Sequence, residues 1–436
     1  MNRNHFARFL FVFICGLRLG QAGFYAILEV GNISSGAVLL LLSVQESVDD
    51  GGDPMANLLV ELYDWHVLEK NVYQAFVSDC DEILFLSLTK ISNNDKLSLR
   101  HFITDEVPHI QRVTFRQLSL EQLANQLDYC LAGYDQVLLD VFGGDSLLAL
   151  SLYQYGLDRH LPIVAMDVER GKQYKWLAGQ LEKEDLDIPT LSIQQLIALR
   201  GGKMLKSKRP IHSVQQIAAI KKLASSAISN PAHWYQVTQF FSLAKTNDLH
   251  AETEKILENN GKYYLYPESQ IPLLVEAGML RIENEDKERI SYSFPSQEAQ
   301  VFCRNKGHIL ELYLYLLALE SQLFDECMIG GEIDWNGIFP ETDNVQNEID
   351  VILRKGRSIT FISCKMTDLS VEAINELEVY ANHFAGESCL KLIVCTGKIN
   401  PVYANRCQEY GVLVIRSEQI PNLIPMLKKY SKRFKR

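Results

Sequence analysis

The chain has 436 residues, of which 47% are hydrophobic and 22% charged, so it can bury more than one core and two or three domains are expected. This composition excludes collagen, a coiled coil and wholesale disorder. The formal net charge of −11 excludes a protein coated in basic residues for indiscriminate nucleic-acid binding, so any such contact must be local.

The first 55 residues do not fit the pattern of the rest of the chain. The segment from Arg8 to Leu17 resembles a short signal-peptide core behind a basic start, but it is too short to span a bilayer and Arg18 interrupts it. Residues 49–54 have the composition of a linker. We expect residues 1–55 to be an N-terminal extension, either dispensable or upstream of the working start, without stable membrane association; export or anchoring is the alternative.

The nine cysteines carry no metal or disulfide signature. They include no CxxC pair and no His–Cys ligand spacing, so neither a zinc site nor a disulfide framework is predicted. The expected compartment is a reducing one, the cytoplasm.

Short apolar segments alternate with helical patterns from residue 57 to residue 167. The segments with strand character are 57–63, 82–87, 136–141 and 162–167, and residues 69–77 form the first helical stretch. Continuously apolar strands separated by helices are typical of an α/β fold with a parallel, doubly wound sheet. We place this domain at residues 56–185.

Small and polar residues follow the strands of this predicted sheet. Ligands of such sheets bind beyond the carboxyl ends of the strands. The glycine pair 143–144 opens a helix, where backbone N–H groups can approach an anion, although a plain tight turn is the alternative. The predicted ligand-binding residues are Asp64, His66, Thr89, Lys90, Gly143, Gly144, Asp145 and Ser146.

Residues 186–300 have a mixed pattern. Helical segments around 192–200 and 212–228 precede the apolar stretch 270–280 and a hairpin pattern at 281–294. A helix followed by a hairpin outlines a winged helix. Because no basic recognition helix is visible, a spacer between two domains is the alternative.

The segment 309–319 is apolar on every face, which predicts a buried helix. Glu311 lies within it and needs an explanation, since a buried carboxylate without a partner is costly. A metal ion or an active-site cleft would satisfy this carboxylate. A salt bridge at the helix end or an exposed edge is the alternative.

A β-hairpin is predicted next, from 347–353 and 359–365, around a charged turn that contains glycine. If the turn is centred on Lys355 and Gly356, Asp350 lies opposite Phe361 and Glu348 lies opposite Ser363. Because side chains alternate between faces, Glu348, Asp350, Ser363 and Lys365 then share one face.

Carboxylates beside a lysine suit the hydrolysis of a phosphodiester bond. Carboxylates hold divalent ions that polarise the phosphate and activate water, while a lysine stabilises charge. Oxygen ligands without His or Cys favour Mg²⁺ or Mn²⁺ over zinc.

These motifs carry a family resemblance. Gly307 to Glu311, Asn347 to Asp350 and Phe361 to Lys365 resemble the motifs of PD-(D/E)xK restriction-endonuclease-like nucleases. Together with residues 61–71 and 140–145, they resemble the CRISPR-associated proteins that join a CARF domain to such a nuclease. The resemblance covers residues 57–425. It implies a Rossmann-like CARF sensor at 56–185, a connector at 186–300 and a restriction-endonuclease-like α/β domain at 301–436.

The resemblance also implies an activity and its ligands. Proteins of this family bind cyclic oligoadenylate, usually the tetra-adenylate, across a CARF homodimer in type III CRISPR antiviral defence. Binding activates metal-dependent cutting of DNA, RNA or both. Carried over by position, Glu311 and Asp350 are the metal-binding acids and Lys365 is the catalytic lysine.

Two positions depart from the family pattern. Ser363 stands where the second acid of the motif belongs, and Glu348 is the expected substitute, with Glu376 or Glu378 as others. Phe142 and Asp145 stand where a threonine-rich turn is usual, and the charge of Asp145 would repel a phosphate.

Two other functions are therefore kept as alternatives. The first is an ungated nuclease of restriction or repair type. The second is a ligand-responsive DNA-binding regulator in which Ser363 marks a decayed nuclease site. The four tryptophans, at 65, 176, 234 and 335, are interpreted as core or interface residues.

Overall fold

The computed structural model describes residues 25–26, 42–43, 56–177, 179–208, 210, 212–337, 346–385 and 389–431. The chain divides into two compact units, Met1–Met55 and Ala56–Arg436. In the first unit, strand β1 (Tyr25–Ala26) pairs with strand β2 (Leu42–Ser43). The apolar segment at 8–17 and the linker at 49–54 lie outside the described residues. No helix in the described part of the chain combines the length and apolar character needed to cross a membrane.

Residues 56–185 form the first sheet, a seven-stranded sheet in the order β5-β4-β3-β6-β7-β8-β9. Neighbouring strands from β5 to β7 are parallel, and β8 and β9 are added antiparallel. The bounds are β3 (Asn57–Leu62), β4 (Glu82–Ser87), β5 (Arg112–Gln117), β6 (Gln136–Asp140), β7 (Ile163–Asp167), β8 (Lys172–Leu177) and β9 (Gln180–Asp185). The predicted α/β fold and its four apolar strands are confirmed to within one residue. Strand β5 and the β8–β9 pair were not predicted, because their charged sequences lack a continuous apolar run.

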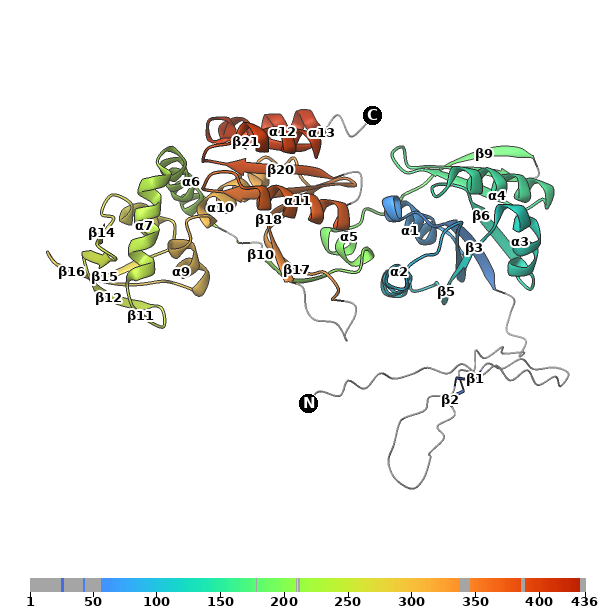
Figure 1. The fold of residues 1–436 in the computed structure, drawn as a ribbon, viewed down its shortest axis with the longest axis horizontal. Helices are drawn as coiled ribbons and strands as arrows, with labels where there is room; N and C mark the ends of the chain where they lie inside the picture. Colours follow the sequence, from blue (N-terminus) through green and yellow to red (C-terminus); the bar gives the residue numbers. More distant parts are fainter. Residues whose placement is uncertain are drawn as a thin grey trace, which may run out of the picture. The chain divides into compact units, whose positions relative to one another are not determined.

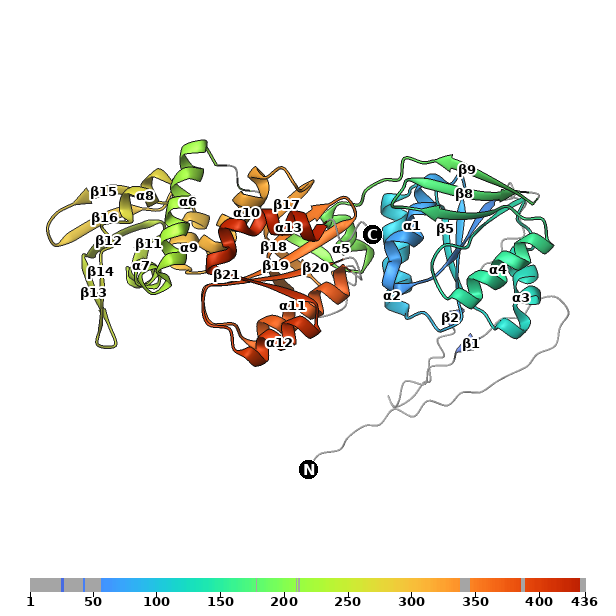
Figure 2. The same cartoon turned by 90° about the horizontal axis from the view of Figure 1, so that it is seen from above.

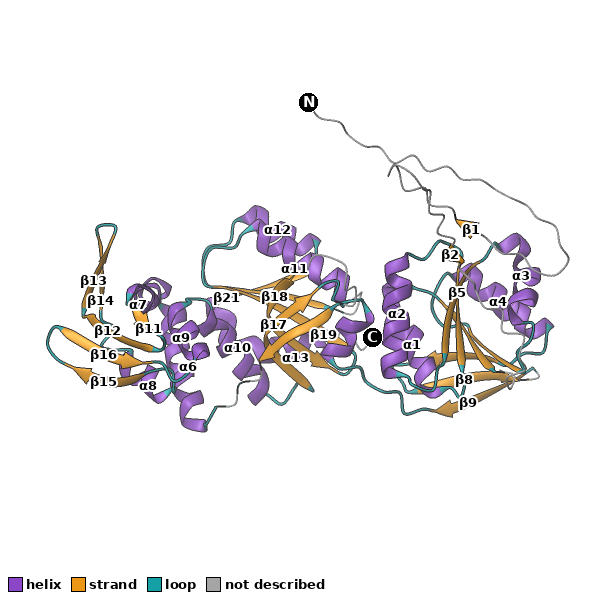
Figure 3. Ribbon diagram, turned by 90° about the horizontal axis from the view of Figure 1, so that it is seen from below, coloured by secondary structure: helices purple, strands orange, loops and turns teal. Residues whose placement is uncertain are grey.

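Helices cover both faces of the first sheet (Figure 3). Leu59 of β3 packs in the core formed with α1 (Leu68–Val77) and α2 (Asn93–Glu106). Its neighbours Leu58 and Val60 pack on the other face, with α3 (Leu123–Leu131) and α4 (Ser146–Asp158). This alternation explains why β3 is apolar along its whole length: both of its faces are buried.

A helical region with a small antiparallel sheet follows (Figure 1). The predicted hairpin at 281–294 is confirmed as β15 (Arg281–Glu285) and β16 (Arg289–Ser293), which extend into the sheet β11-β12-β16-β15. Its other elements are α6 (Val214–Ser229), α7 (Pro231–Leu243), β11 (Thr246–Asn247), β12 (His250–Glu254), β13 (Ile256–Asn259), β14 (Lys262–Leu265), α8 (Ile271–Glu276) and α9 (Gln297–Arg304). Helix α8 has six residues and carries no Lys or Arg.

The second sheet has six strands in the order β10-β17-β18-β19-β20-β21. The bounds are β10 (Lys203–Lys208), β17 (Glu326–Asp334), β18 (Gln346–Lys355), β19 (Ser358–Lys365), β20 (Leu390–Cys395) and β21 (Val412–Arg416). Strand β10 belongs to the segment predicted as the connector, yet it pairs with β17. The second sheet therefore takes its edge strand from a region about 120 residues upstream of β17.

Two sets of helices cover the second sheet (Figure 2). Helix α10 (His308–Glu320) shares a core with Val351, Leu353 and Ile362, and this core continues into α6 and α7. Helix α11 (Val371–Phe384) shares the opposite core with Ile352 and Phe361. The other helices of the described residues are η1 (Trp65–Val67), η2 (Leu120–Gln122), α5 (Ile193–Leu199), α12 (Pro401–Glu409), η4 (Ser417–Asn422) and α13 (Leu423–Ser431).

The β18–β19 hairpin is confirmed, but its predicted register is wrong by two residues. Lys355 pairs with Ser358, so Gly356 and Arg357 form the turn, and Ile352 rather than Asp350 lies opposite Phe361. The backbone of Gly356 has a φ of +56°, which glycine adopts without strain. The paired ladder ends at Val351 and Ile362, so Asp350 lies where β18 leaves the ladder.

Candidate functional site

Helix α10 carries a buried carboxylate, as predicted. Glu311 is 8% exposed, on a helix with seven further buried residues. The Nδ1 atom of His308 lies 2.7 Å from the Oε2 atom of Glu311, one helical turn away. The charge of Glu311 is therefore met by a histidine at the start of the same helix.

The predicted catalytic residues lie close enough to Asp350 for their charges to act on it. Burial and the negative charge of Glu311 raise the pKa of Asp350 to about 6. The nearby charge of Glu348 raises this pKa further, while the backbone N–H of Cys364 and the ammonium group of Lys365 lower it. The N–H of Cys364 donates to Oδ2 of Asp350 over 2.6 Å. The structure thus brings Glu311, Glu348, Asp350 and Lys365 into one electrostatic neighbourhood.

Glu311 and Asp350 are suited to share a divalent cation. Two neighbouring carboxylates in a partly buried place repel each other, and a cation between them would remove that repulsion. The described residues contain no group of three or more His, Cys, Asp or Glu side chains arranged to hold a metal ion. Two protein carboxylates are sufficient for Mg²⁺, which keeps several waters and takes further ligands from a substrate phosphate.

The acids proposed to replace the acid missing at Ser363 have different surroundings. Glu348 lies near Asp350. Glu378 is paired with Lys391, with 2.5 Å between Oε2 and Nζ. Glu376 is exposed and lies near Tyr380. Of the three, Glu348 is therefore the one whose charge reaches Asp350.

An acid that was not predicted extends this cluster. Glu332 of β17 lies directly opposite Glu348 in the ladder. Its Oε2 atom is 2.8 Å from Nζ of Lys206, on the neighbouring strand β10. No sequence signal placed Lys206 here, because β10 is separated from β17 by more than one hundred residues.

The ligand-binding residues predicted in the first sheet lie beyond the carboxyl ends of β3, β4 and β6. Asp64 caps the short helix η1 (Trp65–Val67) by accepting from the N–H of His66. Thr89 and Lys90 are exposed. Gly144 has a φ of +66°, and a Cβ there would lie 2.7 Å from Cβ of Leu62, so this turn requires glycine to pass β3.

The N-terminus of α4 is already capped by the chain itself. Oδ1 of Asp145 accepts from the backbone N–H groups of Leu147 and Leu148, at 2.9 and 3.1 Å. These amides were expected to be available to an anion. A phosphate at this helix would have to displace the carboxylate of Asp145, so Asp145 acts here as a helix cap.

A second pair of buried carboxylates lies beneath this edge, and sequence analysis did not single it out. Glu61 of β3 is 0% exposed and Asp140 at the end of β6 is 1% exposed. Burial raises the pKa of Glu61 well above its usual range, and the charge of Asp140 adds to this rise. Burial also raises the pKa of Asp140 to about 8, against the effect of the Phe142 N–H that donates to it.

This pair should make folding stability fall with rising pH. In the unfolded chain both carboxyls ionise near pH 4, whereas in the folded protein they hold protons to a higher pH. The free energy of unfolding is therefore expected to decrease between about pH 4 and pH 8. Glu61→Gln should lessen that decrease by at least about 1 kcal/mol, the value of one pKa unit. Thermal unfolding at pH 5.5 and pH 8.0 measures this decrease, and Glu276→Gln, at an exposed position, is the control. If the wild type and both variants showed the same pH dependence, burial would not be what raises the pKa of the Glu61 carboxyl.

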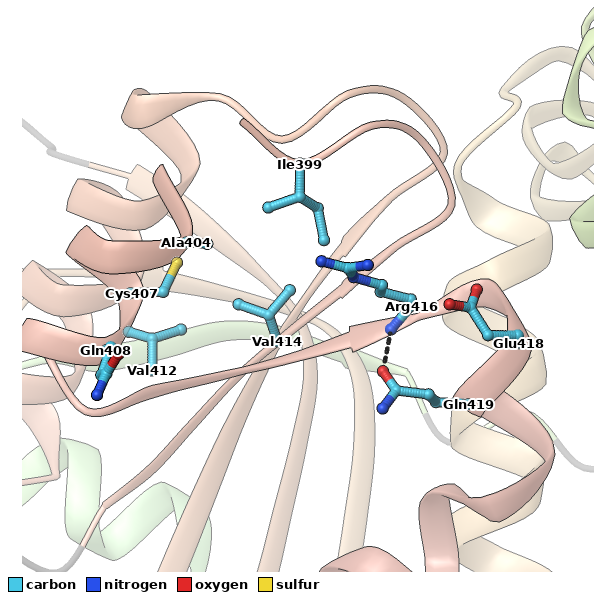
Figure 4. Close-up of a pocket in the computed structure, with 9 residues that line it drawn as sticks. All are labelled: Ile399, Ala404, Cys407, Gln408, Val412, Val414, Arg416, Glu418 and Gln419. Atoms are coloured by element: carbon cyan, nitrogen blue, oxygen red, sulfur yellow. Dashed lines mark hydrogen bonds between the residues drawn. The ribbon is translucent and has the colours of Figure 1, made fainter. Parts of the chain in front are cut away.

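A pocket of about 590 Å³ lies beside β21 and α12 (Figure 4). Val412, Val414 and Cys407 supply apolar lining, and the backbone N–H of Arg416 donates to Oε1 of Gln419 over 3.0 Å. None of the predicted catalytic or ligand-binding residues lines this pocket. It is therefore separate from the cluster around Asp350.

Comparison with solved structures identifies the fold. The protein VC1899 from Vibrio cholerae matches with a TM-score of 0.63 at 16% sequence identity, covering 87% of this chain and 98% of that one. Can2 from Sulfobacillus thermosulfidooxidans, solved in complex with cyclic tetra-adenylate, matches with a TM-score of 0.58 at 18% identity, covering 85% of this chain and 98% of that one. This chain shares their fold. No family model matches the sequence, and a search of curated proteins finds no match.

Proposed function

We propose that this protein is a metal-dependent nuclease that cuts DNA or RNA and is activated by cyclic oligoadenylate. The observation that carries the nuclease proposal is the convergence of Glu311, Asp350 and Lys365, from one helix and two strands, at the place where the β18–β19 ladder ends. Paired carboxylates that can hold a divalent ion, beside an amine that can stabilise negative charge, are suited to phosphodiester hydrolysis.

In this proposal each residue has a separate task. Glu311 and Asp350 hold Mg²⁺ or Mn²⁺, and His308 orients the carboxylate of Glu311 through its Nδ1 atom. The bound ion would polarise the scissile phosphate and activate a water molecule. The ammonium group of Lys365 stabilises the charge that develops on the phosphate. Glu348 supplies the negative charge that Ser363 does not.

The proposed activator is cyclic tetra-adenylate, bound at the carboxyl edge of the first sheet in a homodimer. Its support is the fold shared with Can2, whose structure contains that molecule. Residues 56–185 would be a CARF sensor, 186–300 the connector and 301–436 a PD-(D/E)xK nuclease. The proposed setting is type III CRISPR antiviral defence in the cytoplasm.

The test is a cleavage assay on labelled single-stranded and supercoiled substrates with Mn²⁺ or Mg²⁺, with and without cyclic tetra-adenylate. We expect cutting that requires the activator and is absent from Asp350→Ala and Lys365→Ala. Equal cutting with and without cyclic tetra-adenylate would instead favour an ungated nuclease of restriction or repair type.

Ser363 favours a second candidate function. Without a third acid the chain could be a ligand-responsive DNA-binding regulator, with the α8 and β15–β16 region as its DNA-binding part. Specific binding of a duplex by folded protein, without hydrolysis under any metal condition, would favour the regulator over both nucleases.

A further inference from the structure

Aromatic side chains form a continuous path from the ligand edge of the first sheet to the second sheet. Trp65 follows β3 directly, between the predicted ligand residues Asp64 and His66. Its ring centroid is 6.1 Å from that of His383 on α11. His383 in turn stacks on Trp335, with centroids 4.8 Å apart and planes 13° from parallel. We call Trp65, His383, Trp335 and Tyr380 the aromatic bridge.

The far end of the aromatic bridge lies beside the proposed catalytic strand. The ring of Trp335 meets that of Tyr380 at 5.6 Å, edge to face. The hydroxyl of Tyr380 lies near Asn347 of β18. Burial and the charge of Asp350 raise the pKa of this hydroxyl, while the side chain of Asn347 lowers it. A shift of Tyr380 would therefore act on β18 three residues from Asp350.

Arg200 fixes the near end of the aromatic bridge. Its side chain is 1% exposed and donates to the backbone carbonyls of Trp65, at 2.9 Å, and His66, at 3.4 Å. It also pairs with Glu69 at 3.4 Å and lies over the ring of Trp65, 5.1 Å from its centroid. Because Arg200 stands between α5 and β10, it links the loop after β3 to the edge strand of the second sheet.

The junction holds several polar atoms that are poorly satisfied. Nε2 of His383, Nε1 of Trp335 and Nε of Arg200 are buried without a hydrogen-bond partner among the described residues. Each such atom costs about 1–3 kcal/mol. Burial and the charge of Arg200 also lower the pKa of His383, which favours the neutral form of its ring. A rearrangement that gives these atoms hydrogen-bond partners would recover part of this cost.

We propose that the aromatic bridge couples the sensor to the nuclease. Binding of the activator against Asp64 and His66 displaces Trp65, the displacement passes through His383 and Trp335 to Tyr380, and Tyr380 sets the position of Asn347 and with it Asp350. The aromatic bridge residues are positioning residues and do not touch the substrate. This coupling rests on the proposed gated nuclease and names the means of its regulation.

The central variant is His383→Leu. Leucine favours a helix and fills similar volume, and it removes a buried nitrogen that lacks a partner, so the fold should be retained. Tyr380→Phe removes the hydroxyl group that lies near Asn347 at the other end. Tyr403→Phe, on α12 of the same domain, is the matched control. Three quantities are measured for each full-length protein: the Kd for cyclic tetra-adenylate, cleavage without activator and the fold-stimulation by activator.

We expect His383→Leu to bind cyclic tetra-adenylate with wild-type Kd and to keep the cleavage seen without activator, while stimulation falls by at least about tenfold, equivalent to a coupling of 1.4 kcal/mol. Tyr380→Phe should reduce stimulation to a similar degree at an unchanged Kd. The double variant should be no worse than either single one, because both interrupt a single path. Tyr403→Phe should behave as wild type.

Two failures are distinguishable. A wild-type protein that cyclic tetra-adenylate does not stimulate overturns the gated nuclease and the coupling with it. A stimulated wild type whose stimulation survives in His383→Leu and Tyr380→Phe overturns the coupling alone. Additive losses in the double variant would also overturn the single path.

Discussion

Asp350→Asn should lower metal-dependent cleavage by about 10² to 10³-fold, the loss that follows removal of one charge-stabilising group from an active site. Asparagine keeps the shape of the side chain and can still accept from the N–H of Cys364. Asparagine lacks the negative charge with which Asp350, together with Glu311, would bind a divalent ion. Both the cleavage rate at saturating Mn²⁺ and the affinity for Mn²⁺ should therefore fall.

The same substitution should not destabilise the protein. The pKa of Asp350 is raised to about 6, so the folded state holds a proton that the unfolded state has released, and stability falls as pH rises from about 4 to about 6. Asparagine removes this loss, so the melting temperature at pH 7.5 should be equal or higher. Cleavage rate, Mn²⁺ titration and thermal unfolding are compared with exposed Glu409→Gln. If Asp350→Asn cleaved at the wild-type rate, Asp350 would not be an active-site residue.

The parts of the fold that depend on local pattern could be predicted from the sequence. The apolar strands β3, β4, β6 and β7 lie in the interior of the first sheet, between helices on both of its faces, so their sequences are apolar without a regular alternation and differ clearly from the helices between them. The buried helix α10 and its carboxylate Glu311 were visible for the same reason. Motif resemblance then singled out Asp350 and Lys365, which lie near each other as that resemblance implies.

Features that depend on distant pairings could not be predicted. Lys206 and Glu332 meet only because β10 pairs with β17, and the charged edge strand β10 carries no apolar signal. The register of the β18–β19 hairpin was predicted wrongly because its turn lies at Gly356–Arg357, one residue beyond the predicted turn at Lys355–Gly356. Both turns are compatible with the sequence, and a shift of the turn by one residue moves the strand pairing by two. Trp65 and His383 are more than three hundred residues apart, so no periodicity connects them.

Ser363→Glu should restore the acid that the family pattern has at this position. Cys364, the next residue, donates its N–H to Asp350, so a carboxylate at 363 would stand beside the proposed metal-binding pair. An additional carboxylate beside Glu311 and Asp350 raises the affinity for a divalent cation because it adds both a ligand and a charge. We expect the Mn²⁺ concentration for half-maximal cleavage to fall by about 10-fold or more, the scale on which changes around a metal site act.

Combining Ser363→Glu with Glu348→Gln determines which acid completes the site. If Glu348 acts in place of the missing acid, Glu348→Gln alone should weaken Mn²⁺-dependent cleavage and Ser363→Glu should rescue it. The reason is electrostatic: Glu348 and a glutamate at 363 would each supply the negative charge that the cation requires next to Asp350. The opposite result is equally informative. Failure of Ser363→Glu to restore cleavage to Glu348→Gln would mean that the two carboxylates do not replace each other, which would contradict the proposed role of Glu348.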